Sequence, residues 1–308
     1  MGQTEISQRR VATNGIELNI AEQGADDAPL VLMLHGFPES WYSWRHQFAP
    51  LAAAGYHAVA PDMRGYGNSD KPPGVSAYSI ENLMQDVAAL IDASGCQEVV
   101  LVGHDWGAVI AWFFAIRQVR KLDALIICNV PHPMSMRREF SWRQLKKSWY
   151  IFFFQIPALP EWLFTRNNGA AMRNIMRDSA VDKSKFPDEV GEVYWRNAMQ
   201  PGALTAMINY YRALLRGGAK RQQDQGLPII ETPTLMLWGE DDVALEKSTT
   251  YGTEDYVRDL TIRYLPRVSH WVQQEQPEVV NAMIKAYLQG EPVPELTWQA
   301  ELSTANSG

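Results

Sequence analysis

Short runs of continuously apolar residues, separated by amphipathic helical stretches, are the feature that most constrains the fold of this chain. Leu30–Leu34 reads LVLML, and the run Glu98–Val102 ends in VVLV. Runs of this length without alternating polar residues are typical of strands buried on both faces. We therefore expect an α/β protein, in which helices cover both sides of a mostly parallel sheet.

Helical spacing is clearest between those two runs. Apolar residues recur at intervals of three and four over Ile80–Ile91, after Ser79 as a typical N-cap and before Gly95 as a typical stop. Further helices are expected at Ala108–Ile116 and at Pro277–Gln289, which has proline in its first turn. The remaining predicted strands are Val11–Ala21, His57–Ala60, Ala124–Asn129, Thr234–Trp238 and Leu260–Leu265.

The alternation of strands and helices stops after residue 133. From about residue 137 to 220 there is no strong strand pattern, only helical segments rich in Trp, Tyr, Phe and Met and interrupted by prolines. The sequence therefore predicts a sheet domain in two parts, 1–133 and 227–308, with a helical cap inserted at 134–226. The stretch from Glu291 onward turns polar, and we expect it to form a surface tail.

Composition and charge exclude several classes of function. The chain has 308 residues, of which 46% are hydrophobic and 20% charged, with a net charge of −7. It lacks the basic stripe of nucleic-acid-binding proteins, so no nucleic acid is expected as a partner. The few clusters of basic residues are pairs such as Arg137-Arg138, which are too short for a polybasic stretch, so no stable membrane anchor is expected either.

The two cysteines and the N-terminus indicate where the protein works. Cys96 and Cys128 lie far apart and have neither metal-site nor disulfide spacing. Free thiols suit a reducing compartment, and the first ten residues, MGQTEISQRR, lack the apolar segment of a secretory signal. We expect a cytoplasmic protein without a metal ion or other cofactor.

One segment carries a candidate nucleophile. Residues 103–107 read GHDWG and join a predicted strand to a predicted helix. This is the Gly-x-nucleophile-x-Gly turn, with Asp105 in the central position. A carboxylate is ionised at neutral pH and can displace a leaving group at a saturated carbon, which forms an alkyl ester. The alternative interpretation is that Asp105 only caps the helix that follows.

Four further segments occur in an order that resembles the α/β-hydrolase superfamily. Each follows a predicted strand, and they are His35-Gly36-Phe37-Pro38, Asp62–Asp70, Gly239-Glu240-Asp241-Asp242 and Ser269-His270-Trp271. The resemblance covers residues 10 to 290 and implies an α/β-hydrolase fold, with the chain order nucleophile, acid, histidine.

The resemblance assigns roles to several of these residues. It implies Asp105 as the nucleophile and His270 as the base, because His270 alone among six histidines combines a loop position with a strand-end acid. That acid is Asp242, with Asp241 as the alternative. The backbone N–H groups of Phe37 and Trp106 are expected to form the oxyanion hole.

Within the superfamily, the chain resembles the epoxide hydrolases most closely. In that family two tyrosines of the helical cap hold the epoxide oxygen, and a phenol suits this task because it can donate a hydrogen bond and a proton. Tyr150 and Tyr211 match these positions, and the Tyr-Arg pair at 211 and 212 favours Tyr211 over Tyr210. The implied substrate-binding residues are His35, Phe37, Trp106, Tyr150 and Tyr211.

The implied reaction opens a neutral, apolar epoxide to a vicinal diol through a hydroxyalkyl ester on Asp105, with water as the second reactant. A haloalkane dehalogenase with the same nucleophile is an alternative, although that family has Asn where Phe37 stands. Fluoroacetate dehalogenases have arginines where Trp106 and Val109 stand. A non-catalytic small-molecule-binding protein on the same scaffold is the alternative from another class. The oligomeric state is open, and a homodimer is among the alternatives.

Overall fold

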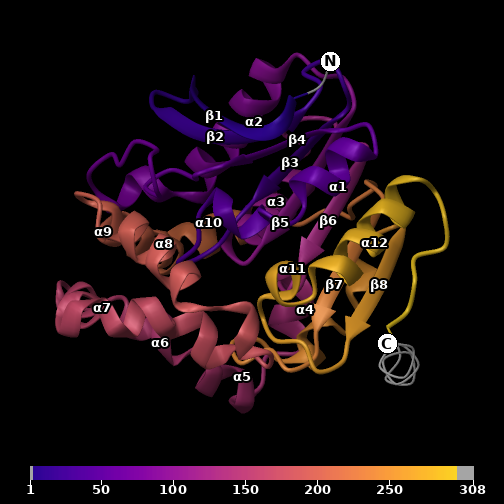
Figure 1. The fold of residues 1–308 in the computed structure, drawn as a ribbon. Coiled ribbons are helices and arrows are strands. Elements are labelled where there is room, and N and C mark those ends of the chain that lie inside the picture. The colour runs from indigo at the N-terminus through magenta and orange to yellow at the C-terminus, as the bar shows by residue number, and fades with distance from the viewer. Residues whose placement is uncertain (1–2, 297–308) are drawn as a thin grey trace, which may run out of the picture.

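The computed structural model describes residues 3–296, which form one eight-stranded sheet with helices packed on it (Figure 1). The strands lie in the order β1-β2-β4-β3-β5-β6-β7-β8. β1 and β2 pair with antiparallel neighbours, and all pairs from β4 to β8 are parallel. The strands are β1 (Gln3–Ala12), β2 (Glu17–Gly24), β3 (Leu30–Leu34), β4 (His57–Pro61), β5 (Val99–His104), β6 (Ala124–Cys128), β7 (Thr234–Gly239) and β8 (Leu260–Leu265).

Both faces of the sheet are buried, as the continuously apolar runs predict. In β3, Leu30, Leu32 and Leu34 pack into one core cluster, which also holds residues of α2 (Ile80–Ser94) and α3 (Trp106–Ile116). Val31 and Met33 point to the opposite face and pack into a second cluster, with residues of α1 (Phe48–Ala53), α11 (Val272–Glu275) and α12 (Pro277–Leu288). The alternation of side chains along a strand explains why every position of β3 is apolar.

The predicted elements and the observed ones agree closely in this domain. α2 begins after Ser79, whose side chain accepts a hydrogen bond from the Asn82 N–H, and ends at Gly95 in the left-handed conformation. One prediction was wrong. The run Val11–Ala21 is two strands, β1 and β2, because Asn14-Gly15 forms a turn in which Gly15 adopts φ +73°. An Asn-Gly pair between apolar stretches is the standard hairpin signal.

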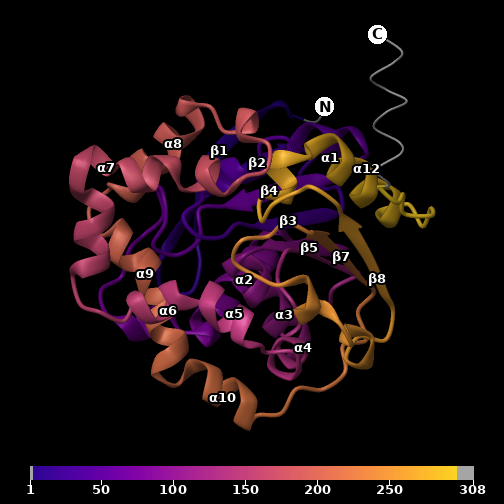
Figure 2. The same cartoon turned by 90° about the horizontal axis from the view of Figure 1, so that it is seen from below.

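Only helices and loops lie between β6 and β7 in the part of the chain that the structure describes. This helical insert, which we call the cap, extends from α4 to α10. The cap covers the edge of the sheet where the parallel strands end, as the two views show (Figures 1 and 2). Its elements are α4 (Pro133–Arg138), α5 (Trp142–Lys147), α6 (Trp149–Phe153), α7 (Leu159–Ser179), α8 (Asp188–Ala198), α9 (Ala203–Ala213) and α10 (Ala219–Asp224).

A buried arginine holds the cap segments together. The Arg212 guanidinium donates to the carbonyl oxygens of Phe154 and Ile156 and to the carboxylate of Glu161. It thereby connects α9 to the chain between α6 and α7. Among the described residues no helix has the length and apolar character needed to cross a membrane.

Candidate active site

The turn after β5 exposes the side chain of Asp105. This residue has φ +49° and ψ −119°, a strained conformation for a residue with a Cβ atom. Two glycines allow the turn, because a Cβ on Gly103 would lie 2.6 Å from the Gly107 backbone, and a Cβ on Gly107 would lie 2.2 Å from the Leu34 carbonyl oxygen. The tight contact between β5, α3 and β3 therefore requires glycine at positions 103 and 107, on either side of Asp105.

The Asp105 carboxylate does not act as a helix cap, which was the alternative interpretation. Its side chain accepts no capping hydrogen bond from α3. Instead Oδ1 accepts a hydrogen bond of 2.6 Å from the backbone N–H of Phe37, in the loop after β3. Gly36 makes this approach possible, since a Cβ there would lie 2.2 Å from Asp105 Cβ. The second expected oxyanion donor belongs to Trp106, the first residue of α3, where helical N–H groups lack intrahelical partners.

His270 lies between two carboxylates. Its Nε2 is 3.7 Å from Asp105 Oδ2, and its Nδ1 is 2.6 Å from Asp242 Oδ2. Burial disfavours the charged imidazole, but the two carboxylates outweigh that penalty and raise the pKa of His270 to about 10. Burial likewise opposes ionisation of Asp105, yet the adjacent imidazole holds the pKa of this carboxyl below its ordinary value.

Asp242, not Asp241, is the partner of His270. Asp242 is 2% exposed, and its Oδ1 accepts from the backbone N–H groups of Ala244 and Leu245. Asp241 follows the same strand but points to solvent. Burial raises the pKa of Asp242, but the charge and hydrogen bond of His270, with smaller contributions from Asn129 and the Leu245 N–H, hold it below its ordinary value.

Asn129 is a residue of this site that sequence reasoning missed. Its amide Nδ2 donates to Asp242 Oδ2 at 2.8 Å, and its Oδ1 accepts from the Gly239 N–H. It stands directly after β6, a central strand, with φ +50°. The sequence feature that could have identified Asn129 is its position at the carboxyl end of a predicted strand, where the binding sites of parallel sheets lie.

A buried glutamate, also missed, joins three loops of the site. The Glu39 carboxylate accepts from the Gly36 N–H and from the side-chain amides of Gln273 and Gln274, and it contacts His104 Nδ1 at 2.8 Å. His104 Nε2 is 2.9 Å from the His270 carbonyl oxygen. The loop carrying Phe37, the turn of Asp105 and the loop of His270 are thereby tied to one another below the site.

A cavity of about 670 Å³ opens above Asp105 between the sheet and the cap. Its walls are mostly aromatic and aliphatic, and the carboxylate and imidazole of the site lie in its floor. The residues that line this cavity include Phe37, Asp105, Lys147, Trp149, Tyr150, Phe153, Phe154, Phe164, Asp178, Tyr211, Val243 and His270.

Two phenols reach this cavity from the cap. Tyr150 of α6 and Tyr211 of α9 both line it, with ring centroids 5.9 Å apart. Burial, reinforced by the nearby Asp105 carboxylate, raises the pKa of each phenol, so both stay protonated hydrogen-bond donors. Tyr210 points the other way, and its hydroxyl donates to the Arg64 carbonyl oxygen. Neighbours on a helix point about 100° apart, which accounts for the difference.

Two of the predicted substrate-binding side chains do not line the cavity. The His35 ring is fully buried, with Nδ1 2.9 Å from the Gly36 carbonyl oxygen and Nε2 accepting from the Met63 N–H. The prediction for His35 was wrong, because this ring holds the loop from below. The Trp106 ring packs edge-on against Tyr211, with centroids 4.9 Å apart, and supports that phenol from behind.

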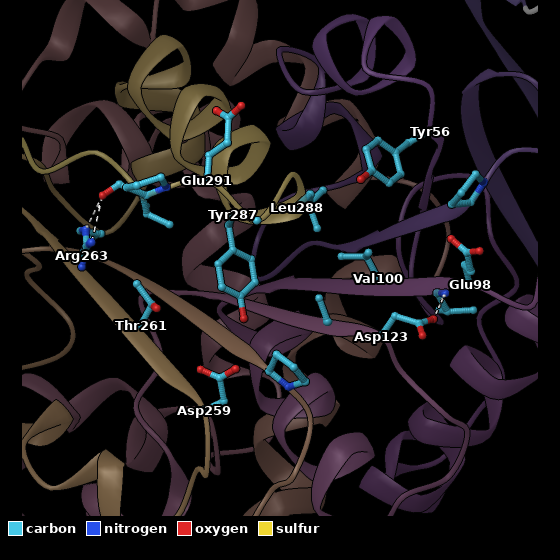
Figure 3. Close-up of a pocket in the computed structure, with 17 residues that line it drawn as sticks. Tyr56, Glu98, Val100, Asp123, Asp259, Thr261, Arg263, Tyr287, Leu288 and Glu291 are labelled. Carbon is cyan, nitrogen blue, oxygen red and sulfur yellow. Dashed lines mark hydrogen bonds between the residues drawn. The ribbon is translucent and has the colours of Figure 1, made fainter.

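A second cavity, of about 550 Å³, lies at the opposite ends of the strands (Figure 3). Val100, Thr261 and the residues before β6 and β7 line it, together with Tyr287 of α12. Carboxylates face it, but none is paired with a histidine as Asp105 is. Active sites of open α/β sheets lie at the carboxyl ends of the strands, so the chemistry belongs to the first cavity. Within residues 3–296 no three His, Cys, Asp or Glu side chains are grouped so as to hold a metal ion.

This chain is similar in sequence to known proteins over most of its length. A family model described as alpha/beta hydrolase fold matches residues 29–253. The AB hydrolase superfamily protein YfhM of Bacillus subtilis is 38% identical over 288 residues, which cover 91% of this chain and 97% of that protein. Epoxide hydrolase 1 of Caenorhabditis elegans is 37% identical over 286 residues, which cover 91% of this chain and 70% of that protein.

A solved structure shares the arrangement of elements. The Bacillus megaterium epoxide hydrolase, crystallised with an inhibitor, matches with a TM-score of 0.83 and 30% sequence identity. The match covers 91% of this chain and 100% of that chain. The fold expected from the sequence motifs is therefore confirmed.

Proposed function

This chain belongs to the α/β-hydrolase family, with the epoxide hydrolases as its relatives, and we propose that it opens a neutral epoxide through a covalent ester on Asp105. One observation carries the mechanism. The two oxygens of the Asp105 carboxylate have different surroundings, because Oδ1 accepts from the Phe37 N–H whereas Oδ2 lies on the side of His270. The two oxygens therefore have different tasks.

In the first step Oδ2 attacks one epoxide carbon from the cavity floor. The new bond is the ester C–O bond, and the C–O bond of the strained ring breaks. Negative charge develops on the former ring oxygen, opposite the attacking carboxylate. Tyr150 and Tyr211 are the donors on that side of the cavity, and one of them supplies the proton that makes this oxygen a hydroxyl.

Ester formation also prepares His270 for the second step. In the free enzyme two carboxylates keep its ring protonated, as the raised pKa indicates. The ester is neutral, so the ring keeps only Asp242 as a charged neighbour and its pKa falls. The protonated ring then transfers its proton to the tyrosine that protonated the epoxide oxygen. This transfer restores the phenol and leaves a neutral imidazole.

In the second step neutral His270 takes a proton from water, and the hydroxide attacks Cγ of the ester. The oxyanion forms on Oδ1, where the Phe37 N–H already donates and the Trp106 N–H is the second donor. One such donor is worth about 3 kcal/mol. The Cγ–Oδ2 bond then breaks, and Oδ2 leaves on the alkyl carbon as the second hydroxyl of the diol, which takes the proton from His270. The water oxygen stays in the carboxyl group of Asp105, and this carboxylic acid returns its proton to the imidazole.

The cavity walls indicate the substrate class. Phe153, Phe154 and Phe164 face a space of about 670 Å³, which suits an apolar aryl or long alkyl substituent. The charged side chains on this lining outside the floor are Lys147 and Asp178. Lys147 is engaged with Glu246 and the Asp242 carbonyl oxygen, so no unpaired cation is offered to a carboxylate substrate. We propose a neutral apolar epoxide, and the free thiols of Cys96 and Cys128 support work in the cytoplasm.

Intact-protein mass spectrometry of His270→Ala tests the mechanism. After exposure to a neutral aryl epoxide, this variant is expected to gain the mass of the whole epoxide, because the ester forms but is not hydrolysed. The gain is absent in the double variant with Asp105→Ala. The matched control is His132→Ala, a buried histidine away from the cavity, which is expected to turn the epoxide over without accumulating an adduct.

The same experiment separates the alternatives. A mass gain from a haloalkane alone, equal to its alkyl group, would assign the chain to the dehalogenases. Ligand binding without an adduct from either reagent in His270→Ala, and without turnover by the wild type, would indicate a binding protein and contradict the proposal.

A further inference from the structure

Exposed apolar side chains gather on the outer face of the cap. Of the thirteen large hydrophobic side chains that are exposed among the described residues, seven lie between residues 140 and 162. Trp142 is 79% exposed, the largest fraction in this group. We name the group the cap patch, and its residues are Phe140, Trp142, Trp149, Phe152, Ile156, Leu159 and Trp162.

The cap patch belongs to α5, α6, the start of α7 and the connections between them. These elements form the side of the cap farthest from the sheet (Figure 1) and lie toward the viewer when the molecule is seen from below (Figure 2). Isolated exposed apolar residues are ordinary, but seven of them within residues 140–162 indicate an interaction surface.

Positive charge accompanies the cap patch in a protein whose net charge is −7. Residues 133–162 contain five basic side chains and two acidic ones, Glu139 and Glu161, which pair with Arg138 and Arg212. Lys147 and Arg138 have carboxylate partners. Arg137, Arg143 and Lys146 are exposed and have no ion-pair partner among the described residues.

We propose that the cap patch binds reversibly to a lipid surface with anionic headgroups. Tryptophan favours the boundary between water and acyl chains, where its ring is apolar and its N–H can meet polar groups. Each Lys or Arg near an anionic surface adds electrostatic attraction. The exposed tryptophans of the cap patch therefore suit the interfacial region of a membrane, and the unpaired cations of the same segment suit its anionic headgroups. This contact is reversible, so it differs from the stable anchor that the sequence excludes.

Charge argues against a second copy of the chain as the occupant. Two copies related by a twofold axis present the same surface to each other. The unpaired cations of one copy would then face those of the other, without carboxylates from this segment to balance them. An anionic lipid surface supplies that balance.

The cap patch is continuous with the cavity. Trp149 is 61% exposed and also lines the cavity, and its ring packs against Phe153 with centroids 5.7 Å apart. Val243, 52% exposed, lines the same opening. In so far as the chain hydrolyses apolar epoxides, as proposed above, a docked cap would take its substrate directly from the lipid phase.

Vesicle flotation tests the proposal with the full chain and lipids that contain no epoxide. We expect the wild type to float with vesicles of phosphatidylcholine and phosphatidylglycerol, and to float far less with phosphatidylcholine alone or at high salt. The double variant Trp142→Ser/Lys146→Glu should lose at least about tenfold in vesicle affinity. Neither residue lines the cavity, so hydrolysis of a water-soluble epoxide should not change.

The control variant Ile229→Ser/Lys121→Glu likewise replaces an exposed apolar residue by serine and an exposed lysine by glutamate, on another surface. It should bind vesicles as the wild type does. Equal loss of binding in both double variants, or no binding by the wild type, would overturn the proposal. Sedimentation that shows a dimer broken only by Trp142→Ser/Lys146→Glu would assign the cap patch to a second copy. Because flotation needs no turnover, its failure and a failure of epoxide hydrolysis are distinguishable.

Discussion

His270 Nε2 lies 3.7 Å from Oδ2 of Asp105, the carboxylate whose other oxygen accepts from the Phe37 N–H. The imidazole and the Asp105 carboxylate are thus electrostatically coupled before any substrate arrives. A protonated imidazole cannot act as a base, and two flanking carboxylates favour that form. In the mechanism proposed above, this coupling orders the two steps by charge, since His270 becomes basic only when Asp105 has been esterified.

The first prediction concerns this coupling. In Asp105→Asn, the pKa of His270 should fall from about 10, because one of the two carboxylates that raise it is removed. Asp242→Asn should lower the pKa of His270 further, since the charge of Asp242 raises this pKa more than the charge of Asp105 does. Titration of the imidazole by NMR measures both shifts. An unchanged or increased pKa in Asp105→Asn would contradict the coupling.

The second prediction separates the two adjacent tyrosines. Tyr211→Phe should slow ester formation by about 10²-fold, because the developing alkoxide loses a donor. Tyr210→Phe, the matched control, should leave that rate unchanged and lower the free energy of unfolding by about 1 kcal/mol, since its bond to the Arg64 carbonyl oxygen is lost. Single-turnover kinetics and urea unfolding measure these effects, and equal rates in the two variants would refute the assignment.

The third prediction separates the two adjacent aspartates. Asp242→Asn should slow ester hydrolysis by about 10⁴-fold, as loss of the orienting carboxylate does in other triads. Ester formation should be affected much less, so the intermediate should accumulate. Asp241→Asn changes an exposed carboxylate and should behave as the wild type. Rapid-quench mass spectrometry follows the intermediate in both variants.

The fourth prediction tests the approach of the oxyanion loop to the nucleophile. Gly36→Ala should abolish ester formation, because the new methyl group would lie 2.2 Å from Asp105 Cβ and 2.3 Å from Oδ1. The crowding should also lower the free energy of unfolding by about 1–3 kcal/mol. Gly226→Ala, where the added Cβ meets open space, should cost about 1 kcal/mol through its positive φ and leave activity intact. Thermal unfolding with the mass assay distinguishes the two.

Local sequence patterns account for most of the sheet domain. β3 has the predicted bounds, and α2 begins and ends at the predicted cap and stop residues. The GHDWG pattern predicts the geometry of its turn. The glycines on either side of Asp105 are required by close contacts with the turn itself and with the adjacent strand β3. The missed hairpin at Asn14-Gly15 was also a local signal, overlooked within a longer apolar run.

Long-range contacts account for what the sequence left open. Asp241 and Asp242 are adjacent in sequence, and only the position of His270 decides which one is its partner. His35 belongs to the correct loop, yet its contacts with Gly36 and Met63 turn the ring away from the cavity. Glu39 gives no local signal for its role, because its partners Gly36, His104 and the pair Gln273-Gln274 come from three separate stretches of the chain.

The sequence by itself determined the order of strands and helices, the glycine-flanked turn that exposes Asp105 and the loop position of His270, since these depend on spacing, turn chemistry and apolar periodicity over a few residues. The tertiary structure decided which acid meets that histidine, which tyrosine of a pair enters the cavity, and which aromatic residues of the cap remain exposed. Those outcomes depend on the direction of side chains across contacts between distant segments. Apolar periodicity indicates which face of a helix or strand is buried. Only packing against neighbouring elements determines which residues that face contacts.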